Sequence, residues 1–308
     1  MKSLIIGAAG FVGEYLINEL LSFNDEVYAT KLANENIKAS SNVKIYDLDI
    51  LNENNIKEVL EEIKPDCIYH LAAQSSVALS WKKPKLTAEI NIIGSINLLE
   101  AVRMYLPNTK VLLVGSSEEY GKIDYSKRVD ENIKSNPQNI YAITKMTVEQ
   151  IGKIYANAYN LNIYMTRSFN HIGPNQSRQF VVADFCNQVV DIEKGIQEPV
   201  IRVGNLKSKR DFTDVRDIVK AYRIIMEKGQ NGEVYNVGSG NSISIEEILN
   251  MILNNSKKEI KVEIDSARFR PIDVEKIEAD ITKINSLGWN RTYKLEDTIK
   301  DILNSLRK

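Results

Sequence analysis

A glycine-rich turn directly after an apolar run at the start of the chain constrains the fold more than any other feature of the sequence. Residues 2–6 read Lys-Ser-Leu-Ile-Ile, and Gly7-Ala8-Ala9-Gly10-Phe11-Val12-Gly13 follows at once. Glycines allow a tight turn and let the backbone approach a pyrophosphate, and the N-terminus of the next helix offers unpaired N–H groups. The segment predicts a strand, a phosphate-binding turn and a helix; the alternative is a strand-to-helix turn without a ligand.

Short β-rich runs alternate with helical stretches over the rest of the first half. The apolar patterning predicts strands at 2–6, 26–31, 43–46, 67–71, 111–115 and 162–169, with helices at 11–22, 56–63, 90–105 and 141–159. This alternation is typical of an α/β protein with a doubly wound parallel sheet of the Rossmann type.

The regular alternation ends after Asn170. Gly173, Pro174 and Asn175 predict a loop over 171–179. Further elements are expected at 180–194, 199–203, 234–237 and 245–254, with a last helix after Leu295. No linker separates the two halves. We therefore expect a nucleotide-binding domain of residues 1–170 with about 212–240, and a smaller α/β substrate-binding lobe of residues 171–211 and 241–308.

Composition excludes several kinds of protein. Lys and Arg number 40 against 41 Asp and Glu, so a broad surface for nucleic acid or an anionic membrane is not expected. The longest apolar runs are far shorter than the roughly 20 residues that a membrane span needs. Cys67, Cys186, His70 and His171 lack a zinc-binding spacing, so no metal site is expected. We expect a cytoplasmic protein with reduced thiols.

The end of the second predicted strand bears on the choice of cofactor. An NAD site usually has Asp or Glu there to bind the ribose 2′-hydroxyl, whereas this strand ends in Thr30-Lys31. A lysine and a hydroxyl suit a 2′-phosphate, so NADPH is favoured and NAD stays possible. Asp47 could hydrogen-bond to the adenine moiety and Leu48 could pack on it, unless Lys31 and Asp47 simply face solvent.

Tyr141 and Lys145 stand four residues apart near the start of a predicted helix, so their side chains share one face. A nearby ammonium favours the phenolate and makes the tyrosine a usable acid or base. Such pairs also arise by chance on many helices. Behind a dinucleotide-binding turn, and with Ser116-Ser117 ending the preceding strand, the pair indicates a catalytic group.

With these residues in place, the chain resembles the extended short-chain dehydrogenases/reductases that act on nucleotide sugars. The resemblance covers essentially the whole length, and its motifs are the glycine turn, His70-Leu71-Ala72-Ala73-Gln74, residues 91–97, Gly115-Ser116-Ser117-Glu118-Glu119-Tyr120-Gly121, Tyr141 with Lys145, residues 167–174, Gly204-Asn205, Arg210-Asp211-Phe212 and Arg270-Pro271. Within the family, the chain is most similar to the GDP-mannose branch and to its reductases of GDP-4-keto-6-deoxy-D-mannose, which form GDP-D-rhamnose. One departure is Asn139-Ile140, where the family often has Ser-Pro before the tyrosine.

The resemblance implies a role for each matching residue. NADPH would deliver hydride to the C4 carbonyl, Tyr141 would donate the proton, Ser116 would hydrogen-bond the same oxygen, and Lys145 would bind the nicotinamide ribose. The implied cofactor-binding residues are Gly7, Gly10, Phe11, Val12, Gly13, Thr30, Lys31, Asp47, Leu48, Leu71, Ala72, Ala73, Tyr141, Lys145 and His171. The implied substrate-binding residues are Ser76, Ser117, Glu118, Asn170, Phe180, Val181, Arg210 and Arg270, and the two arginines would bind the diphosphate.

Several residues keep a second interpretation. Arg210 and Arg270 could be surface ion-pair residues, Asn170 could only form a turn, and Ser116 could only cap the end of a strand. Tyr120 could line a sugar pocket or pack beneath the loop. His70 and His171 are interpreted as structural rather than as metal ligands or proton shuttles.

The presence of Glu118 means that the sequence does not decide between a reductase and a dehydratase. In the family's GDP-mannose 4,6-dehydratases the matching glutamate removes the C5 proton and helps to expel water, which a simple reductase does not require. A dehydratase with recycled NADP therefore remains an alternative to the reductase, and an epimerase is a weaker one. A non-catalytic NADP-binding protein is the alternative from another class. The family commonly dimerises through two helices, here 91–105 and 141–159, so a homodimer is expected.

Overall fold

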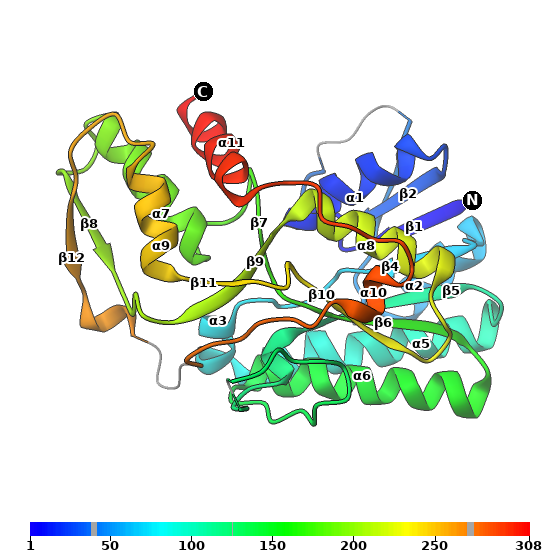
Figure 1. The fold of residues 1–308 in the computed structure, drawn as a ribbon. Coiled ribbons are helices and arrows are strands. Elements are labelled where there is room, and N and C mark those ends of the chain that lie inside the picture. Colours follow the sequence, from blue (N-terminus) through cyan, green and yellow to red (C-terminus); the bar gives the residue numbers. More distant parts are fainter. Residues whose placement is uncertain (38–41, 125, 270–273) are drawn as a thin grey trace.

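Parallel strands form the central sheet of the computed structural model, which describes residues 1–37, 42–124, 126–269 and 274–308 (Figure 1). Seven strands of these described residues lie in the order β10-β6-β5-β4-β1-β2-β3. Their bounds are β1 (Lys2–Ile6), β2 (Glu26–Lys31), β3 (Lys44–Asp47), β4 (Cys67–His70), β5 (Lys110–Ser116), β6 (Asn162–Ser168) and β10 (Val234–Val237). The strand order reverses beside β1, where α/β sheets bind their ligands. The predicted Rossmann-type sheet is confirmed.

Two helical layers cover the sheet (Figure 1). One layer contains α1 (Phe11–Ser22) and α8 (Val215–Lys228), and the other contains α2 (Glu53–Ile63), α5 (Gly94–Tyr105) and α6 (Ile140–Tyr159). Each layer packs on its own face of the strands through a separate apolar cluster, because a parallel sheet is buried on both sides.

The predicted helix at 90–105 is divided in two. A π-helical turn, η1 (Glu89–Ile93), precedes α5, and the short helices α3 (Val77–Lys82) and α4 (Pro84–Ala88) lead into it. The buried Asn91 side chain accepts from the N–H of Gln74 at 2.8 Å and donates to the hydroxyl of Thr144 at 2.9 Å. These bonds tie the segment after β4 to the helix that carries Tyr141 and Lys145.

The remaining elements build a second lobe. They are β7 (Asn170–Ile172), α7 (Val181–Glu193), β8 (Val200–Val203), β9 (Lys209–Asp214), β11 (Ser242–Ser244), α9 (Ile245–Leu253), β12 (Lys261–Ile264), η3 (Ser266–Arg268) and α11 (Leu295–Arg307). The exception is α10 (Thr282–Asn285), which packs against the central sheet at β10. Strand β7 extends into the start of the predicted loop, because Asn170 and Ile172 pair with Phe212 and Asp214 of β9. A third apolar cluster joins α7, α9 and α11.

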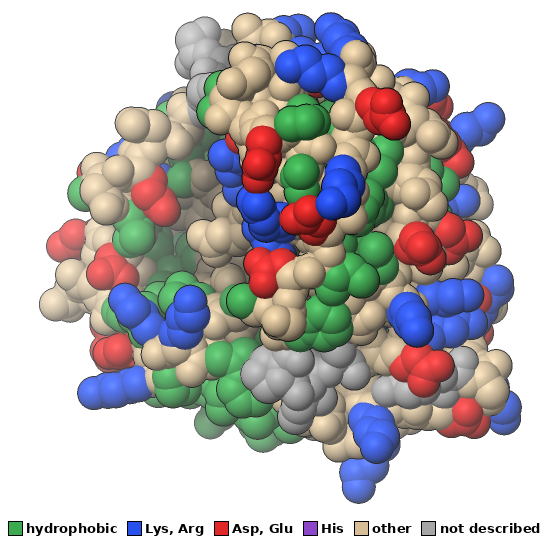
Figure 2. Space-filling view, turned by 90° about the vertical axis from the view of Figure 1, so that its left-hand side faces the viewer, with side chains coloured by type: hydrophobic (Ala, Val, Ile, Leu, Met, Phe, Trp, Pro, Cys, Tyr) green, Lys and Arg blue, Asp and Glu red, His purple; other side chains and the backbone are tan. Residues whose placement is uncertain are grey.

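Charged side chains of both signs are interspersed on the face where the second lobe lies (Figure 2). Among the described residues, none of the helices combines the length and apolar character needed to cross a membrane. The described residues also contain no group of three or more His, Cys, Asp or Glu side chains placed to bind a metal ion.

Candidate active site

The glycine turn joins β1 to α1 by very close backbone packing. Gly7 has a φ of +83°, and a Cβ added there would lie 2.6 Å from the Cα of Ala72. A Cβ on Gly13 would lie 2.0 Å from the carbonyl oxygen of Ala8. The N-cap Gly10 has no side chain to cap the helix, so the N-terminus of α1 and its N–H groups stay accessible to an anion.

The predicted adenosine-binding residues lie at the ends of β2 and β3. Thr30 is fully buried, and its hydroxyl accepts the N–H of Gly7 at 3.2 Å, so it supports the glycine turn. Lys31 Nζ lies 2.6 Å from Asp47 Oδ1, and the Asp47 side chain is mostly exposed. Leu48 is buried in the apolar cluster beneath α2 and α5. The ammonium at this strand end is thus paired with a carboxylate.

Ser116, Tyr141 and Lys145 come together where β5 ends and α6 begins. Ser116 is the last residue of β5, and Tyr141 is the second residue of α6. Lys145 Nζ donates to the carbonyl of Val114 at 2.8 Å and lies 6.0 Å from the centre of the Tyr141 ring. Tyr141 and Lys145 are each only 9% exposed. The structure therefore places the three predicted catalytic side chains in one buried group.

Burial changes the acidity of the two titratable members of this group. It lowers the pKa of Lys145 to about 8, and a negative charge on Glu119 would act against that change. Burial also raises the pKa of Tyr141 well above its ordinary value, and hydrogen bonding with Ser116 acts against it. A tyrosine that stays neutral can act as a proton donor. The neighbouring Lys145 is a cation that can itself lose a proton near neutral pH.

Glu118 lies at the rim of this group, in the short turn η2 (Ser117–Glu119). Its Oε2 accepts the side-chain N–H of Asn139 at 2.9 Å, and Asn139 also caps α6 by accepting the N–H of Ala142. The charge of Glu118 acts to raise the pKa of Tyr141. Asn139 thus takes a defined role at the position where the chain departs from the family. The neighbouring Ser117 is buried.

Strand β7 and the segment after it pack against the N-terminal half of α1. The ring of His171 stacks on Phe11 with centres 6.1 Å apart, and its Nδ1 lies 3.1 Å from the carbonyl oxygen of Phe169. The Tyr15 hydroxyl donates to the carbonyl of Pro174 at 2.9 Å. Val12 is partly buried on the same helix. His171 is thus held between the glycine turn and the second lobe.

The residues after β4 lie beside the glycine turn. His70 is buried, with Nε2 3.0 Å from the hydroxyl of Ser95, and burial lowers its pKa to about 3. Leu71, Ala72 and Ala73 are half-buried, and Ala72 is the residue that Gly7 approaches. Ser76 accepts the N–H of Leu79 and caps α3.

The predicted substrate-binding residues of the second lobe are more widely spread. Asn170 begins β7, Phe180 is the N-cap of α7, and Val181 is its first residue. Arg210 is buried and donates from Nη1 to the carbonyls of Lys209 and Val274. Arg270 lies outside the described residues.

A pocket of about 230 Å³ also opens on this lobe, at α7, β8 and η3. It is lined by arginines, aspartates and glutamines, and two pairs of the charged residues form ion pairs, Arg178 with Asp191 and Arg268 with Asp184. Its charges are therefore largely balanced within the protein.

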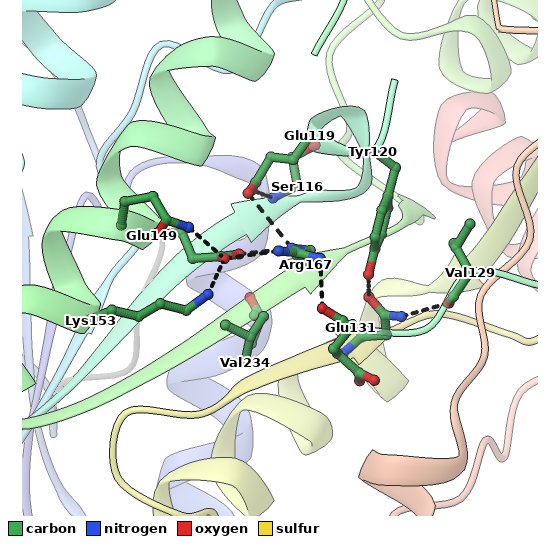
Figure 3. Close-up of polar contacts among 12 residues, drawn as sticks. Ser116, Glu119, Tyr120, Val129, Glu131, Glu149, Lys153, Arg167 and Val234 are labelled. Atoms are coloured by element: carbon green, nitrogen blue, oxygen red, sulfur yellow. Dashed lines mark hydrogen bonds and ion pairs between the residues drawn. The ribbon is translucent and has the colours of Figure 1, made fainter. Parts of the chain in front are cut away.

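A buried ionic network behind Ser116 was not predicted from the sequence. Glu119, Arg167 and Glu149 come from η2, β6 and α6 (Figure 3), and each side chain is at most 4% exposed. Glu149 stands four residues after Lys145, and that spacing is the one signal by which it could have been found.

Tyr120 is fully buried and donates to the Asn236 side chain at 2.7 Å, so it packs beneath the loop.

The parallel sheet, the glycine turn and the Ser–Tyr–Lys group define a short-chain dehydrogenase/reductase of the extended type. A family model described as GDP-mannose 4,6 dehydratase matches residues 4–302, and the chain belongs to this family. It is therefore an enzyme of the group of nucleotide-sugar dehydratases, reductases and epimerases.

The relatives of the chain differ in the reaction that their names give. The chain is 28% identical to the GDP-6-deoxy-D-mannose reductase of Pseudomonas aeruginosa over 83% of this chain and 84% of the relative. It is also 28% identical to GDP-mannose 4,6 dehydratase 2 of Arabidopsis thaliana, over 97% and 84%.

Solved structures show the same spread. The structure of RMD from Pseudomonas aeruginosa complexed with NADPH superposes with a TM-score of 0.87 at 25% identity, covering 100% of this chain and 99% of the other. The UDP-glucose 4-epimerase of Thermus thermophilus in complex with NAD gives 0.90 at 26% identity, again over 100% and 99%.

Proposed function

We propose that the protein uses NADPH to reduce the C4 keto group of a GDP-4-keto-6-deoxyhexose, converting GDP-4-dehydro-6-deoxy-D-mannose to GDP-D-rhamnose. The observation that carries this proposal is the buried group of Ser116, Tyr141 and Lys145 beside an accessible helix N-terminus. The family of the chain and its similarity to a GDP-6-deoxy-D-mannose reductase support it.

Each side chain of this group has its own role in a carbonyl reduction. Bound NADPH supplies the hydride. Tyr141 donates a proton to the oxygen that gains charge, and the Ser116 hydroxyl donates a hydrogen bond to the same oxygen. Lys145 holds the ribose and, as a cation, favours the phenolate that remains. Arg210 and Arg270 are assigned to the substrate diphosphate.

The preference for NADPH rests on the end of β2. Lys31 offers a cation for a 2′-phosphate, whereas a 2′-hydroxyl would be bound by a carboxylate. Asp47, now paired with Lys31, is such a carboxylate on the neighbouring strand. Binding of NAD is therefore possible, and the ratio of the two dissociation constants in Lys31→Ala tests the role of the lysine.

A second candidate reaction, the 4,6-dehydration of GDP-mannose, is favoured by the position of Glu118. Asn139 anchors its carboxylate by a hydrogen bond, and a carboxylate is the kind of base that removal of the C5 proton would need. In that reaction the cofactor is reduced and reoxidised in every turnover.

One experiment separates the two candidates. Purified protein is given NADPH with GDP-4-keto-6-deoxymannose, or NADP with GDP-mannose, and both absorbance and products are followed. One NADPH consumed for each keto sugar supports the reductase. Conversion of GDP-mannose to a keto sugar without net change in NADPH supports the dehydratase. If the protein were a binding module only, neither sugar would react and Tyr141→Phe would bind the nucleotides unchanged.

We further propose a homodimer formed by α5 and α6. Apolar side chains of these helices and the adjoining turn are unusually exposed, among them Ile93, Met104, Ile143 and Ile154 at 41 to 58%. Exposed apolar side chains on neighbouring helices are the kind of surface that an interface covers. Sedimentation of the purified protein should give twice the chain mass.

A further inference from the structure

Glu119 is a fully buried carboxyl group next to Ser116, and the proposed reaction does not use it. Its Oε1 accepts the N–H of Ser116 at 2.7 Å, while the Ser116 hydroxyl accepts the N–H of Glu118 at 3.2 Å. These two bonds form a capping box around η2. The orientation of Ser116 at the end of β5 therefore depends directly on the Glu119 carboxyl group.

The backbone leaves room for this carboxyl group at Gly115. A Cβ added to Gly115 would lie 2.6 Å from Glu119 Oε1 and 2.3 Å from the carbonyl oxygen of Thr166. Real Cβ atoms do not approach oxygen so closely. The glycine before Ser116 is thus required by the position of Glu119 and by the pairing of β5 with β6.

The second oxygen of Glu119 is in a different situation. Oε2 lies 3.8 Å from Nε of Arg167, and among the described residues it has no hydrogen-bond partner. Arg167 directs Nε and Nη2 at the two oxygens of Glu149, at 2.8 and 2.9 Å (Figure 3). The cation that could neutralise Glu119 is already engaged in a bidentate pair.

The buried carboxyl groups of Glu119 and Glu149 therefore lie beside the same Arg167 guanidinium. Burial raises the pKa of Glu119 well above its usual range, and the neighbouring Glu149 carboxylate raises it further. Burial also acts to raise the pKa of Glu149, but Arg167 and Lys153 lower it below its usual value. An ionised Oε2 would have no donor to accept from, whereas a protonated Oε2 can donate to the Glu149 carboxylate.

We propose that Glu119 is a positioning residue that stays a neutral carboxylic acid, accepts the Ser116 N–H through Oε1 and donates its proton from Oε2 to Glu149. Its effect on catalysis rests on the proposed function, because it acts through Ser116. Neutrality also matters for the neighbours: a charge on Glu119 would raise the pKa of both Tyr141 and Lys145. An uncharged Glu119 aligns Ser116 without raising the pKa of Tyr141, so the tyrosine can still give up its proton.

The charged and titratable groups around Glu119 come from three elements. They are Arg167 on β6, Tyr141, Lys145, Glu149 and Lys153 on α6, and Glu118 and Tyr120 next to it in the chain. Glutamine is the matched substitution, because it keeps an oxygen for Ser116 and offers an N–H to Glu149. Leucine keeps the approximate volume but loses both hydrogen bonds.

Infrared spectroscopy of the protein without substrate tests the protonation state directly. The wild type at pH 7 should show the carbonyl band of a protonated, buried carboxyl group, and E119Q should lack it. E131Q serves as the control, because Glu131 is a half-buried glutamate whose pKa is also raised by burial. A wild-type spectrum without the band, or a band that E131Q removes instead, would overturn the proposal whatever reaction the enzyme catalyses.

Kinetics test the positioning role with whichever sugar nucleotide is turned over. E119Q should keep kcat within about twofold and leave the pH profile of kcat unchanged, because it replaces a neutral group by a neutral group. E119L should lower kcat by about tenfold or more without changing KM for the dinucleotide, since Ser116 loses its anchor. A shifted pH profile in E119Q would contradict neutrality, and an unchanged kcat in E119L would contradict positioning. Should E119L fail to fold, the spectrum and pH profile of E119Q decide.

Discussion

Replacing Gly13 by alanine tests how tightly the first turn of α1 packs on the glycine turn. The new Cβ would lie 2.0 Å from the carbonyl oxygen of Ala8, whereas a comfortable carbon–oxygen contact is about 3.3 Å. The start of α1 must therefore move by about 1 Å. Overpacking of this kind costs roughly 3 kcal/mol, and the better helix propensity of alanine returns about 1 kcal/mol, leaving a net loss of about 2 kcal/mol.

Thermal melts and cofactor titration measure this change. At about 2.1 cal/mol/K per residue, the 308 residues have an unfolding entropy of roughly 0.65 kcal/mol/K, so Tm should fall by about 3 °C. NADPH binding should weaken by about tenfold, because the moved N–H groups no longer meet the pyrophosphate.

Gly10→Ala is the matched control. Its φ of −72° suits any residue, and the added Cβ would meet only the carbonyl oxygen of Gly7, at 3.5 Å. We expect a Tm within about 1 °C of the wild type. A Gly13→Ala protein with wild-type Tm and wild-type NADPH affinity would refute the packing argument.

Four further substitutions test the other assignments. Tyr141→Phe should lower kcat by about 10²- to 10⁴-fold while the dissociation constant of NADPH stays unchanged in a fluorescence titration. Burial lowers the pKa of Lys145 from 10.5 to about 8, so its charge opposes folding below pH 8 and this cost fades as the pH rises to 10.5. Lys145→Met should therefore be more stable than the wild type at pH 7 by at most roughly 3 kcal/mol, with the difference vanishing by pH 10.5 in urea melts. Glu118→Gln should leave reduction of the keto sugar intact in a reductase but abolish keto-sugar formation from GDP-mannose in a dehydratase. Ile154→Lys should convert the proposed dimer to a monomer in sedimentation experiments.

The parallel sheet could be predicted from the sequence because its strands alternate with helices and the period of the apolar residues changes clearly between them. Among the elements that were missed in the first domain are the short helices α3 and α4 and the longer helix α8. Helix α8 follows β9 without a turn residue between them, since Asp214 ends the strand and also caps the helix. Its Asp217 is fully buried and accepts N–H groups of Thr292 and Tyr293. Only the folded chain shows that partners 75 residues away satisfy this carboxylate.

The candidate site shows the same limit. Ser116, Tyr141 and Lys145 could be found because two of them share a helix face and the third ends the preceding strand. Thr30 was predicted as a ligand for a phosphate, yet its hydroxyl accepts the N–H of Gly7, which follows only from the pairing of β1 with β2. The partnership of Glu119 with Arg167 and Glu149 depends on three elements that no local pattern brings together.

One side of α6 connects the proposed chemistry to the stability of the fold. Tyr141, Lys145, Glu149 and Lys153 follow one another at four-residue spacing, and at 100° per residue the row turns by about 120° around the helix. Lys145 and Glu149 consequently face the sheet and are buried, whereas Lys153 is 35% exposed. Each buried member meets a compensating group from β5 or β6: the Val114 carbonyl for Lys145, and Arg167 for Glu149. Removing one partner leaves an uncompensated charge, which costs about 3–5 kcal/mol. Substitutions that break the Arg167–Glu149 pair should therefore lower stability, and they should lower activity as well because Glu149 lies on the same helix as Tyr141 and Lys145.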